Sequence, residues 1–168
     1  MAEAVARVAR RVNEVVENGG HHLDLSSCAL NAFPTGLYLA MKSVADQIYS
    51  ISLANNELKS LTGKFFTTFK ELQELDLEGN LLARLPGEVS FLTNLKVINL
   101  SKNKLDKFPD ELTKVQCIES INLEANQIKA IPVETLNNLP HLLLVNLKLN
   151  PINKDNSNLG TLKFELAM

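Results

Sequence analysis

The stretch from residue 72 to residue 109 carries the same series of apolar positions twice. The first copy contains Leu72, Leu75, Leu77, Asn80 and Leu82, and the second contains, 23 residues later, Leu95, Ile98, Leu100, Asn103 and Leu105. A pattern of this kind that returns after roughly 20 to 29 residues predicts one short strand and one returning connection per repeat. We expect the rest of the chain to be organised around this unit.

The unit occurs six times along the chain. Each copy has two apolar residues, one position apart, at the core of a predicted strand: Leu23 and Leu25, Ile51 and Leu53, Leu75 and Leu77, Ile98 and Leu100, Ile121 and Leu123, Val145 and Leu147. A turn residue follows three positions later, at Cys28, Asn56, Asn80, Asn103, Asn126 and Asn150. A strand of this type cannot bury its apolar face alone, so the six are predicted to stack into one continuous parallel sheet.

The asparagines of this turn position have a physical explanation. An inward amide offers an acceptor and two donors, so a column of amides can satisfy the backbone groups that tight turns leave unpaired inside the stack. Replacing one by alanine would cost about 1 to 3 kcal/mol for each stranded group. Cys28 interrupts the column with a weak donor, so we expect the first turn to be the least well tied and Cys28 to be structural.

The two ends of the chain are predicted to cover the ends of the stack, which makes residues 1–168 a single domain. Residues 1–19 form a capping helix with an apolar stripe at Val5, Val8, Val12, Val15 and Val16, and Gly19 ends it. Residues 20–152 hold the six repeats. Residues 153–168 form a C-terminal cap, with a polar loop at 153–158 and a truncated seventh strand around Leu159, Leu162 and Phe164.

The segments that return from one strand to the next show apolar residues at steps of three and four, which predicts short helical or 3₁₀ turns. Pro86, Pro109 and Pro132 stand where three of these returns begin. The second return uses Phe65, Phe66 and Phe69 instead of a proline. The first return is longer by about one helical turn, which predicts a fuller helix.

The spacing L-P-x-x-L-x-x-L-x-x-L-x-x-L-x-L-x-x-N in the middle units, for instance from Leu85 to Asn103 with Val89 and Ile98 at two of the leucine positions, resembles the small intracellular proteins built of leucine-rich repeats. This resemblance covers the whole chain. It implies a right-handed α/β solenoid whose concave parallel sheet binds other proteins, and it implies no catalytic residues. Two hypotheses for the function follow: a protein interaction module, or a regulatory or adaptor subunit of an enzyme such as a phosphatase or ubiquitin ligase.

Outward strand positions predict the chemistry of the concave face. Five of its eighteen positions are acidic and one is basic, with the acidic excess greatest in the third unit. We expect a partner protein, presenting a basic segment, to bind through Glu74, Asp76, Glu78, Asn99, Asn122, Glu124, Asn146 and Lys148. The alternative is an ordinary solvated polar face. Leu144 and Leu149 could add an apolar anchor unless the C-terminal tail covers them.

The sequence offers little support for an enzyme. The acidic residues of the third unit resemble the carboxylate pair of a glycosidase, but no other feature predicts a closed cleft around them. His21, His22 and Asp24 lack further metal ligands at a supporting spacing, and no nucleotide-binding or nucleophile motif occurs. We therefore expect no catalytic residue, no metal and no cofactor.

Charge and cysteine content narrow the partners and the compartment. The formal charge of -2 and the pI near 5.9 provide no overall basic field, so neither nucleic acid nor a membrane is expected as a partner, and the chain is expected to be monomeric. Cys28 and Cys117 fall in the first and fifth units, about 19 Å apart and too distant for a disulfide. Two free thiols favour an intracellular location, cytoplasmic or nuclear.

Overall fold

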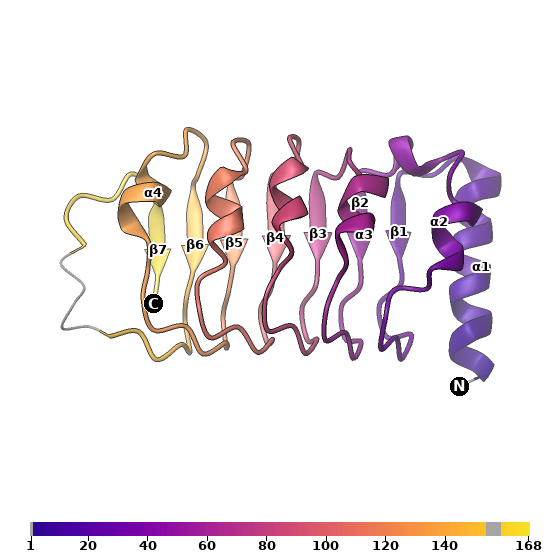
Figure 1. The fold of residues 1–168 in the computed structure, drawn as a ribbon, viewed down its shortest axis with the longest axis horizontal. Coiled ribbons are helices and arrows are strands. Elements are labelled where there is room, and N and C mark those ends of the chain that lie inside the picture. Colours follow the sequence, from indigo (N-terminus) through magenta and orange to yellow (C-terminus); the bar gives the residue numbers. More distant parts are fainter. Residues whose placement is uncertain (1, 154–158) are drawn as a thin grey trace.

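A computed structural model of the chain describes residues 2–153 and 159–168, and it shows a row of coils stacked side by side (Figure 1). The elements in chain order are α1 (Ala2–Asn18), β1 (His22–Asp24), α2 (Gly36–Ala40), η1 (Ala45–Gln47), β2 (Ser50–Ser52), α3 (Gly63–Thr68), β3 (Glu74–Asp76), η2 (Gly87–Phe91), β4 (Val97–Asn99), η3 (Asp110–Lys114), β5 (Ser120–Asn122), α4 (Val133–Asn137), β6 (Leu144–Asn146) and β7 (Glu165–Ala167). The sequence predicts a polar loop at 153–158, and residues 154–158 of it lie outside the described residues.

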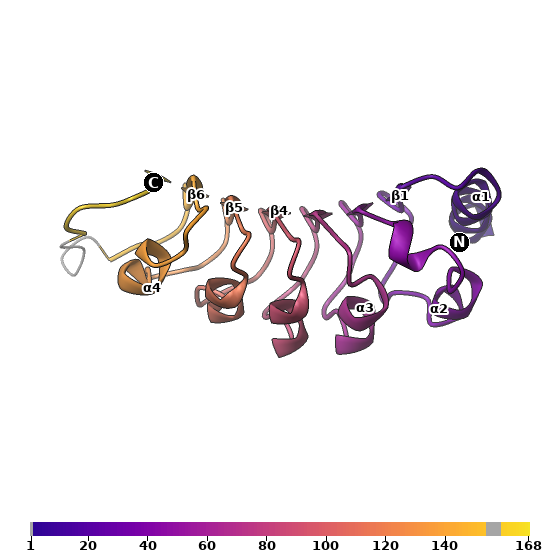
Figure 2. The ribbon, with the colours of Figure 1, turned by 90° about the horizontal axis from the view of Figure 1, so that it is seen from above.

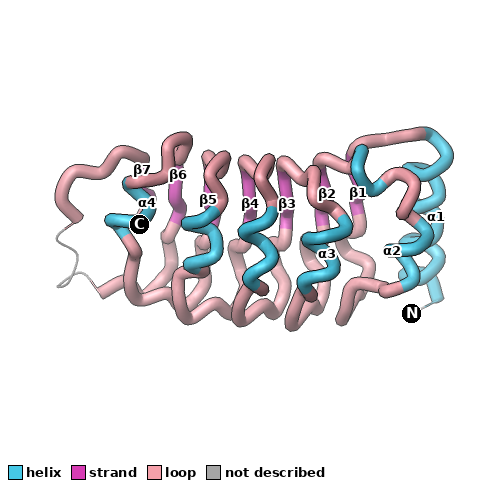
Figure 3. The backbone as a smooth tube through the Cα atoms, turned by 45° about the horizontal axis from the view of Figure 1, so that its top comes forward, coloured by secondary structure: helices cyan, strands magenta, loops and turns pink. Residues whose placement is uncertain are grey.

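The strands form one parallel sheet in the order β1 to β7, which confirms the predicted fold class. Each strand pairs in register with the next, so that Leu75 lies between Ile51 and Ile98. Figure 2 shows the strands along the inner side of a shallow arc and the return segments along its outer side. Viewed obliquely in Figure 3, the short helices of the returns lie in front of the strand row.

The core fills the space between the sheet and the return segments. All twelve predicted inward strand residues are at most 1% exposed. The second return adds the aromatic residues Phe65, Phe66 and Phe69, which are fully buried. Phe33 from the first return packs edge-on against Phe65, with ring centroids 5.1 Å apart. These buried aromatic rings fill the core at the second return, which lacks the proline that precedes the helical turn in the third, fourth and fifth returns.

The prolines lie one position before the helical turns of the last three returns. Pro86, Pro109 and Pro132 are the residues that precede η2, η3 and α4, and their carbonyl oxygens accept the first hydrogen bond of each turn. Proline suits this place because its own missing N–H would have no partner in the turn. The first return differs from the expected fuller helix: it breaks into α2 and η1, separated by four residues.

Helix α1 covers the N-terminal end of the stack, as expected. Val8 and Val12 are buried against the first repeat, and Val15 and Val16 are partly buried. Gly19 ends the helix with a φ of 66° and donates its N–H to the carbonyl of Val15. The predicted stripe was too long at its start, since Val5 is 71% exposed.

The seventh strand exists, but the predicted register was wrong. Leu166, and not Leu162, lies opposite Val145 of β6. The cause is Asn137 of α4, whose amide donates to the carbonyl of Thr161 and whose oxygen accepts from the N–H of Lys163. These bonds hold residues 161–163 beside the outer helix, so that the strand begins only at Glu165.

Candidate partner-binding face

The concave face is made of the outward strand positions. In the first column, Glu74 and Val97 lie directly opposite each other on β3 and β4, and both are exposed, with Val97 at 37%. Asp76 and Glu78 are half-buried and point outward as well. The three acidic residues of the third unit are therefore on one face, since alternate residues of a strand project to the same side about 6.5 to 7 Å apart.

The second column has a structural role that was not anticipated. The Oδ1 atom of Asp76 accepts a hydrogen bond of 3.0 Å from the backbone N–H of Glu78, two residues later. Asn99, Asn122 and Asn146 make the same bond to the second residue after them. A polar side chain that accepts from the N–H two residues later forms an Asx turn. This recurrence of Asp or Asn could have revealed the role from the sequence.

The third column is only partly available to a partner. Ala54 and Ser101 are buried at 6% and 3% exposure, although both stand at outward positions. Glu78 lies 3.6 Å from the ammonium of Lys102, and the carboxylate of Glu124 accepts a 3.1 Å hydrogen bond from the amide of Asn146. Lys148 remains exposed at the end of the column. Of the four acidic residues predicted to bind a partner, Glu74 is exposed, whereas Asp76, Glu78 and Glu124 are half-buried.

A shallow hollow of about 290 Å³ lies over β1 to β4. It is lined by His22, Ser50, Ile51, Ser52, Glu74, Leu75, Asp76, Val97 and Asn99. Among the predicted binding residues, the structure brings Glu74, Asp76 and Asn99 together here, whereas Asn122, Glu124, Asn146 and Lys148 lie farther along the sheet. The nearest histidine, His22, is held by a 2.8 Å hydrogen bond between its Nδ1 atom and the hydroxyl of Ser50.

Behind this face, the turn asparagines tie each coil to the one before it. The amide of Asn103 donates to the carbonyl oxygens of Leu77, Leu100 and Ser101, and its oxygen accepts from the N–H of Leu82. Asn56, Asn80, Asn126 and Asn150 repeat this arrangement. No buried side-chain nitrogen or oxygen in the described part of the chain lacks a hydrogen-bond partner. The turns therefore hold the concave strands in register.

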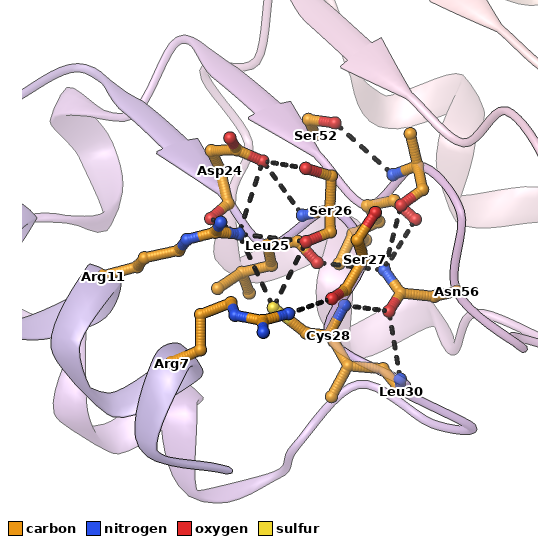
Figure 4. A network of polar contacts seen from close by, with 12 residues as sticks. Arg7, Arg11, Asp24, Leu25, Ser26, Ser27, Cys28, Leu30, Ser52 and Asn56 are labelled. Atoms are coloured by element: carbon orange, nitrogen blue, oxygen red, sulfur yellow. Dashed lines mark hydrogen bonds and ion pairs between the residues drawn. The ribbon is translucent and has the colours of Figure 1, made fainter. Parts of the chain in front are cut away.

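The first turn, which was expected to be the least well tied, receives hydrogen bonds from outside the repeats (Figure 4). The guanidinium of Arg11, on α1, donates to the carbonyl oxygens of Asp24 and Ser26, at 3.1 Å and 2.9 Å. Arg7 donates to the carbonyl of Ser27. The thiol of Cys28 itself donates to Ser26. The helix arginines thus supply donors where the asparagine column has none.

Arg11 also approaches the carboxylate of Asp24, at 3.8 Å. Partial burial acts to raise the pKa of Asp24, but hydrogen bonds from the hydroxyl and N–H of Ser26, with the positive charges of Arg11 and His22, outweigh it and lower the pKa below the usual 3.8. A carboxyl whose pKa is lowered on folding stabilises the fold above pH 3.8. This contribution is lost as the pH falls further.

The remaining candidates from the sequence were a metal site at the histidines and the two cysteine thiols. Within residues 2–153 and 159–168, no three His, Cys, Asp or Glu side chains are grouped as metal ligands. His21 stacks on Tyr49, with ring centroids 4.9 Å apart. Cys28 is buried and Cys117 is half-buried, and both thiols are free.

Leu144 and Leu149, the two leucines considered as an apolar anchor, differ in their exposure. Leu149 is 75% exposed, so the described part of the tail leaves it open. Leu144 is half-buried in the sheet, between Ser120 and Glu165. The leucine in the turn is therefore open to a partner to a greater extent than the leucine in the strand.

Comparison with known proteins identifies the family. The leucine rich repeat pattern matches residues 46–105 and 71–128. The mouse leucine-rich repeat-containing protein 20 is 65% identical over 155 residues, which cover 92% of this chain and 84% of the mouse protein. The chain belongs to the leucine-rich repeat family. Human leucine-rich repeat-containing protein 20 is 62% identical over 96 residues, covering 57% of this chain and 52% of the human protein.

Solved leucine-rich repeat structures share the fold. A leucine-rich repeat protein of Leptospira interrogans superposes with a TM-score of 0.70 at 30% identity, over 80% of this chain and 32% of that one. An internalin of Listeria monocytogenes gives a TM-score of 0.67 at 16% identity, over 88% and 41%. The chain thus spans well under half the length of either structure. Leucine-rich repeat proteins generally mediate protein–protein interactions and are typically non-catalytic.

Proposed function

We propose that this chain is a non-catalytic module that binds a partner protein on its concave face, through a basic segment of that partner. The supporting observation is the set of acidic groups at the hollow over β1 to β4. Neither Glu74 nor Asp76 forms an ion pair within the described part of the chain, whereas Glu78 has Lys102 as a neighbour. Glu74 and Asp76 therefore keep their charge available to a partner.

The surroundings of these carboxylates suit a lysine or arginine side chain. Val97, exposed beside Glu74, offers an apolar contact for the long methylene stem, and the carboxylates offer acceptors for the charged head. The contribution of such exposed pairs is modest, about 0.2 to 1 kcal/mol each, so we expect the acidic face to select and orient the partner.

Two further expectations belong to this proposal. The free thiols of Cys28 and Cys117 favour a reducing, intracellular compartment, where the partner would also reside. The chain itself is expected to act as a monomer. None of the helices in the described part of the chain is long and apolar enough to cross a membrane.

The test uses a fluorescent lysine- and arginine-rich peptide and charge variants of the face. Asp76→Asn removes a charge but retains the Asx-turn acceptor, because asparagine already stands at this position in β4, β5 and β6. Glu74→Lys combined with Asp76→Asn is expected to weaken peptide binding at least about fivefold, with the difference shrinking at high salt.

The matched control is Glu134→Lys combined with Asp110→Asn, which changes the net charge equally on the outer side of the stack. Equal weakening in the control and the face variant would show that only the net charge of the protein matters. Unchanged binding in the face variant would also refute the proposed site.

A further inference from the structure

A second charged surface, of opposite sign, lies along one edge of the solenoid. It consists of the four residues that follow the turn asparagine in repeats two to five, and we call these segments, 57–60, 81–84, 104–107 and 127–130, the loop row. The strands all run toward this edge, so the four segments lie side by side along the lower margin of Figure 1. The loop row contains the basic residues Lys59, Arg84, Lys104, Lys107 and Lys129, against Glu57 and Asp106.

The basic residues of the loop row are arranged by the repeat itself. In each segment the second residue is a buried leucine or isoleucine, such as Leu82. The residue that directly follows each segment is also apolar and is buried or partly buried. The chain between these two anchors is forced outward. One basic residue stands there in every segment: Lys59, Arg84, Lys107 and Lys129, all exposed.

The charges of these four residues are not used inside the protein. The ion pairs among the described residues involve Arg11, Lys70 and Lys102, and none of the loop-row cations has an ion pair or a side-chain hydrogen bond there. Even the acidic residues within the row, Glu57 and Asp106, form no such pair. Four exposed and uncompensated cations in consecutive repeats form a positive line on a chain whose net charge is -2.

The length of the line indicates what could lie along it. Neighbouring parallel strands are about 4.8 Å apart, so four consecutive repeats span about 15 Å. An extended peptide rises about 3.3 Å per residue and presents alternate side chains on one side about 6.6 Å apart. Five or six residues of an extended chain with acidic side chains would therefore face the whole line.

Two other polyanions fit less well. Single-stranded nucleic acid is usually held by aromatic side chains that stack on its bases, and the loop row contains no aromatic residue. An anionic membrane attracts a surface of one sign, whereas Glu57 and Asp106 are interleaved with the cations and would be repelled by it. A protein segment of mixed polarity can place its own polar groups opposite these acids.

We propose that the loop row is a docking site for an acidic, extended protein segment, separate from the concave face and independent of the function proposed for it. The cations contact the acidic side chains from the edge of the stack, so that binding there leaves the concave sheet open. A partner with both basic and acidic segments could then occupy both surfaces, and each contact would raise the effective concentration of the other.

The test measures binding of a fluorescein-labelled hexapeptide in which glutamate alternates with serine, by fluorescence anisotropy at low salt. The row variant is Lys59→Gln, Arg84→Gln, Lys107→Gln and Lys129→Gln. The control variant removes the same number of positive charges elsewhere, by Lys42→Gln, Lys70→Gln, Lys96→Gln and Lys114→Gln. Thermal melting of both variants checks that each is folded, and is expected to change little because all eight side chains are exposed.

We expect wild type and the control variant to bind the peptide alike and the row variant to bind it at least about tenfold more weakly. Equal binding by the two variants, or no measurable binding by wild type, would overturn the proposal. Phosphatidylserine-containing vesicles and a uridine hexanucleotide are measured in parallel. Tighter binding of either than of the peptide, lost in the row variant, would assign the row to a membrane or to RNA and would also overturn it.

Discussion

At the scale of single residues, the most informative position is the one before each turn residue. Its backbone is left-handed in every turn, with φ between 52° and 71°, at Ser27, Asn55, Gly79, Lys102, Ala125 and Leu149. This conformation costs a residue with a side chain about 1 to 2 kcal/mol, and glycine avoids the cost. Only one of the six turns has glycine, so the others carry a small strain.

Replacing Leu149 by glycine is therefore expected to stabilise the protein by about 0.5 to 1 kcal/mol, after the extra flexibility of glycine in the unfolded chain is deducted. Leu149 is 75% exposed, so little burial is lost. Urea denaturation measures the change. Leu149→Ala, which keeps the strain, is expected to show no gain, and a lower stability of Leu149→Gly than of wild type would contradict the argument.

The reverse change, Gly79→Ala, is expected to destabilise the protein by more than about 1 kcal/mol. The φ of 71° would be strained, and the added methyl carbon would lie 2.5 Å from Oδ1 of Asn55. The melting temperature is compared with that of Gly87→Ala, where an added carbon meets nothing within 4 Å. This comparison separates the strain at position 79 from the general effect of losing a glycine. Equal melting of the two variants would count against it.

Among the turn residues themselves, Asn103→Ala is expected to be strongly destabilising. It would leave the buried N–H of Leu82 without its acceptor, at about 1 to 3 kcal/mol if no water replaces it. The carbonyls of Leu77 and Leu100 would each lose one of two amide donors and keep those of Asn80 and Asn126. Asn94→Ala is the control, because Asn94 is exposed and its side chain bonds, among the described residues, to Glu71 alone. Similar denaturation midpoints for the two variants would refute a structural role for the ladder.

At the scale of elements, the repeats and the presence of a helix and a strand at the two ends could be predicted from sequence, whereas the contacts and the strand register at the ends could not. The strand positions recur because each coil must bury the same two residues against identical neighbours, as with Ile98 between Leu75 and Ile121. The ends have a neighbour on one side only. There, single contacts decide the structure: Asn137 moves the start of β7, and Arg11 replaces an asparagine in the first turn.

The candidate site could also be predicted from the sequence only in part. The alternation of the strands placed Glu74 and Asp76 on the concave face, but it could not distinguish exposure from local bonding. Ser101 is outward in sequence and yet 3% exposed, because its hydroxyl and its N–H both bond to Asn99. Side chains that turn back onto their own backbone cannot be recognised from periodicity alone.

The arginine contact of the capping helix gives a prediction at this scale. Arg11→Met retains the apolar stem but removes the donors to Asp24 and Ser26, and is expected to cost about 1 to 2 kcal/mol. Arg10→Met on the same helix is the control, since Arg10 is exposed and makes no hydrogen bond or ion pair among the described residues. If both variants unfolded at the same urea concentration, the first turn would not depend on α1.

At the scale of the whole molecule, stability is shared between neighbouring coils. Each strand pairs only with the strand before it and the strand after it, so a defect in a middle coil weakens two interfaces. Leu100 is fully buried in the fourth coil, and Leu100→Ala is expected to cost about 2 to 5 kcal/mol through lost burial and the cavity left behind. Calorimetry measures it, and melting at the wild-type temperature would mean that the strand register is wrong.

The whole molecule also separates charge in space. Acidic groups gather on the concave sheet and uncompensated basic groups gather along the loop row, although the total charge is only -2. Surfaces of opposite sign on one rigid stack can select partners that neither would select alone. Net charge, from which partners are often inferred, conceals this separation.

The turn asparagines also give the array a direction. Asn80 bonds to Leu53 and Leu58 of the coil that precedes it, and Asn103 bonds likewise to Leu77 and Leu82. The amide of each coil therefore bonds to sequence that has already left the ribosome, and the N–H of a coil, such as that of Leu82, gains its acceptor when the next coil is translated. Such a protein is suited to assemble coil by coil during synthesis, and it could gain or lose a whole coil in evolution while the remaining amides keep their partners.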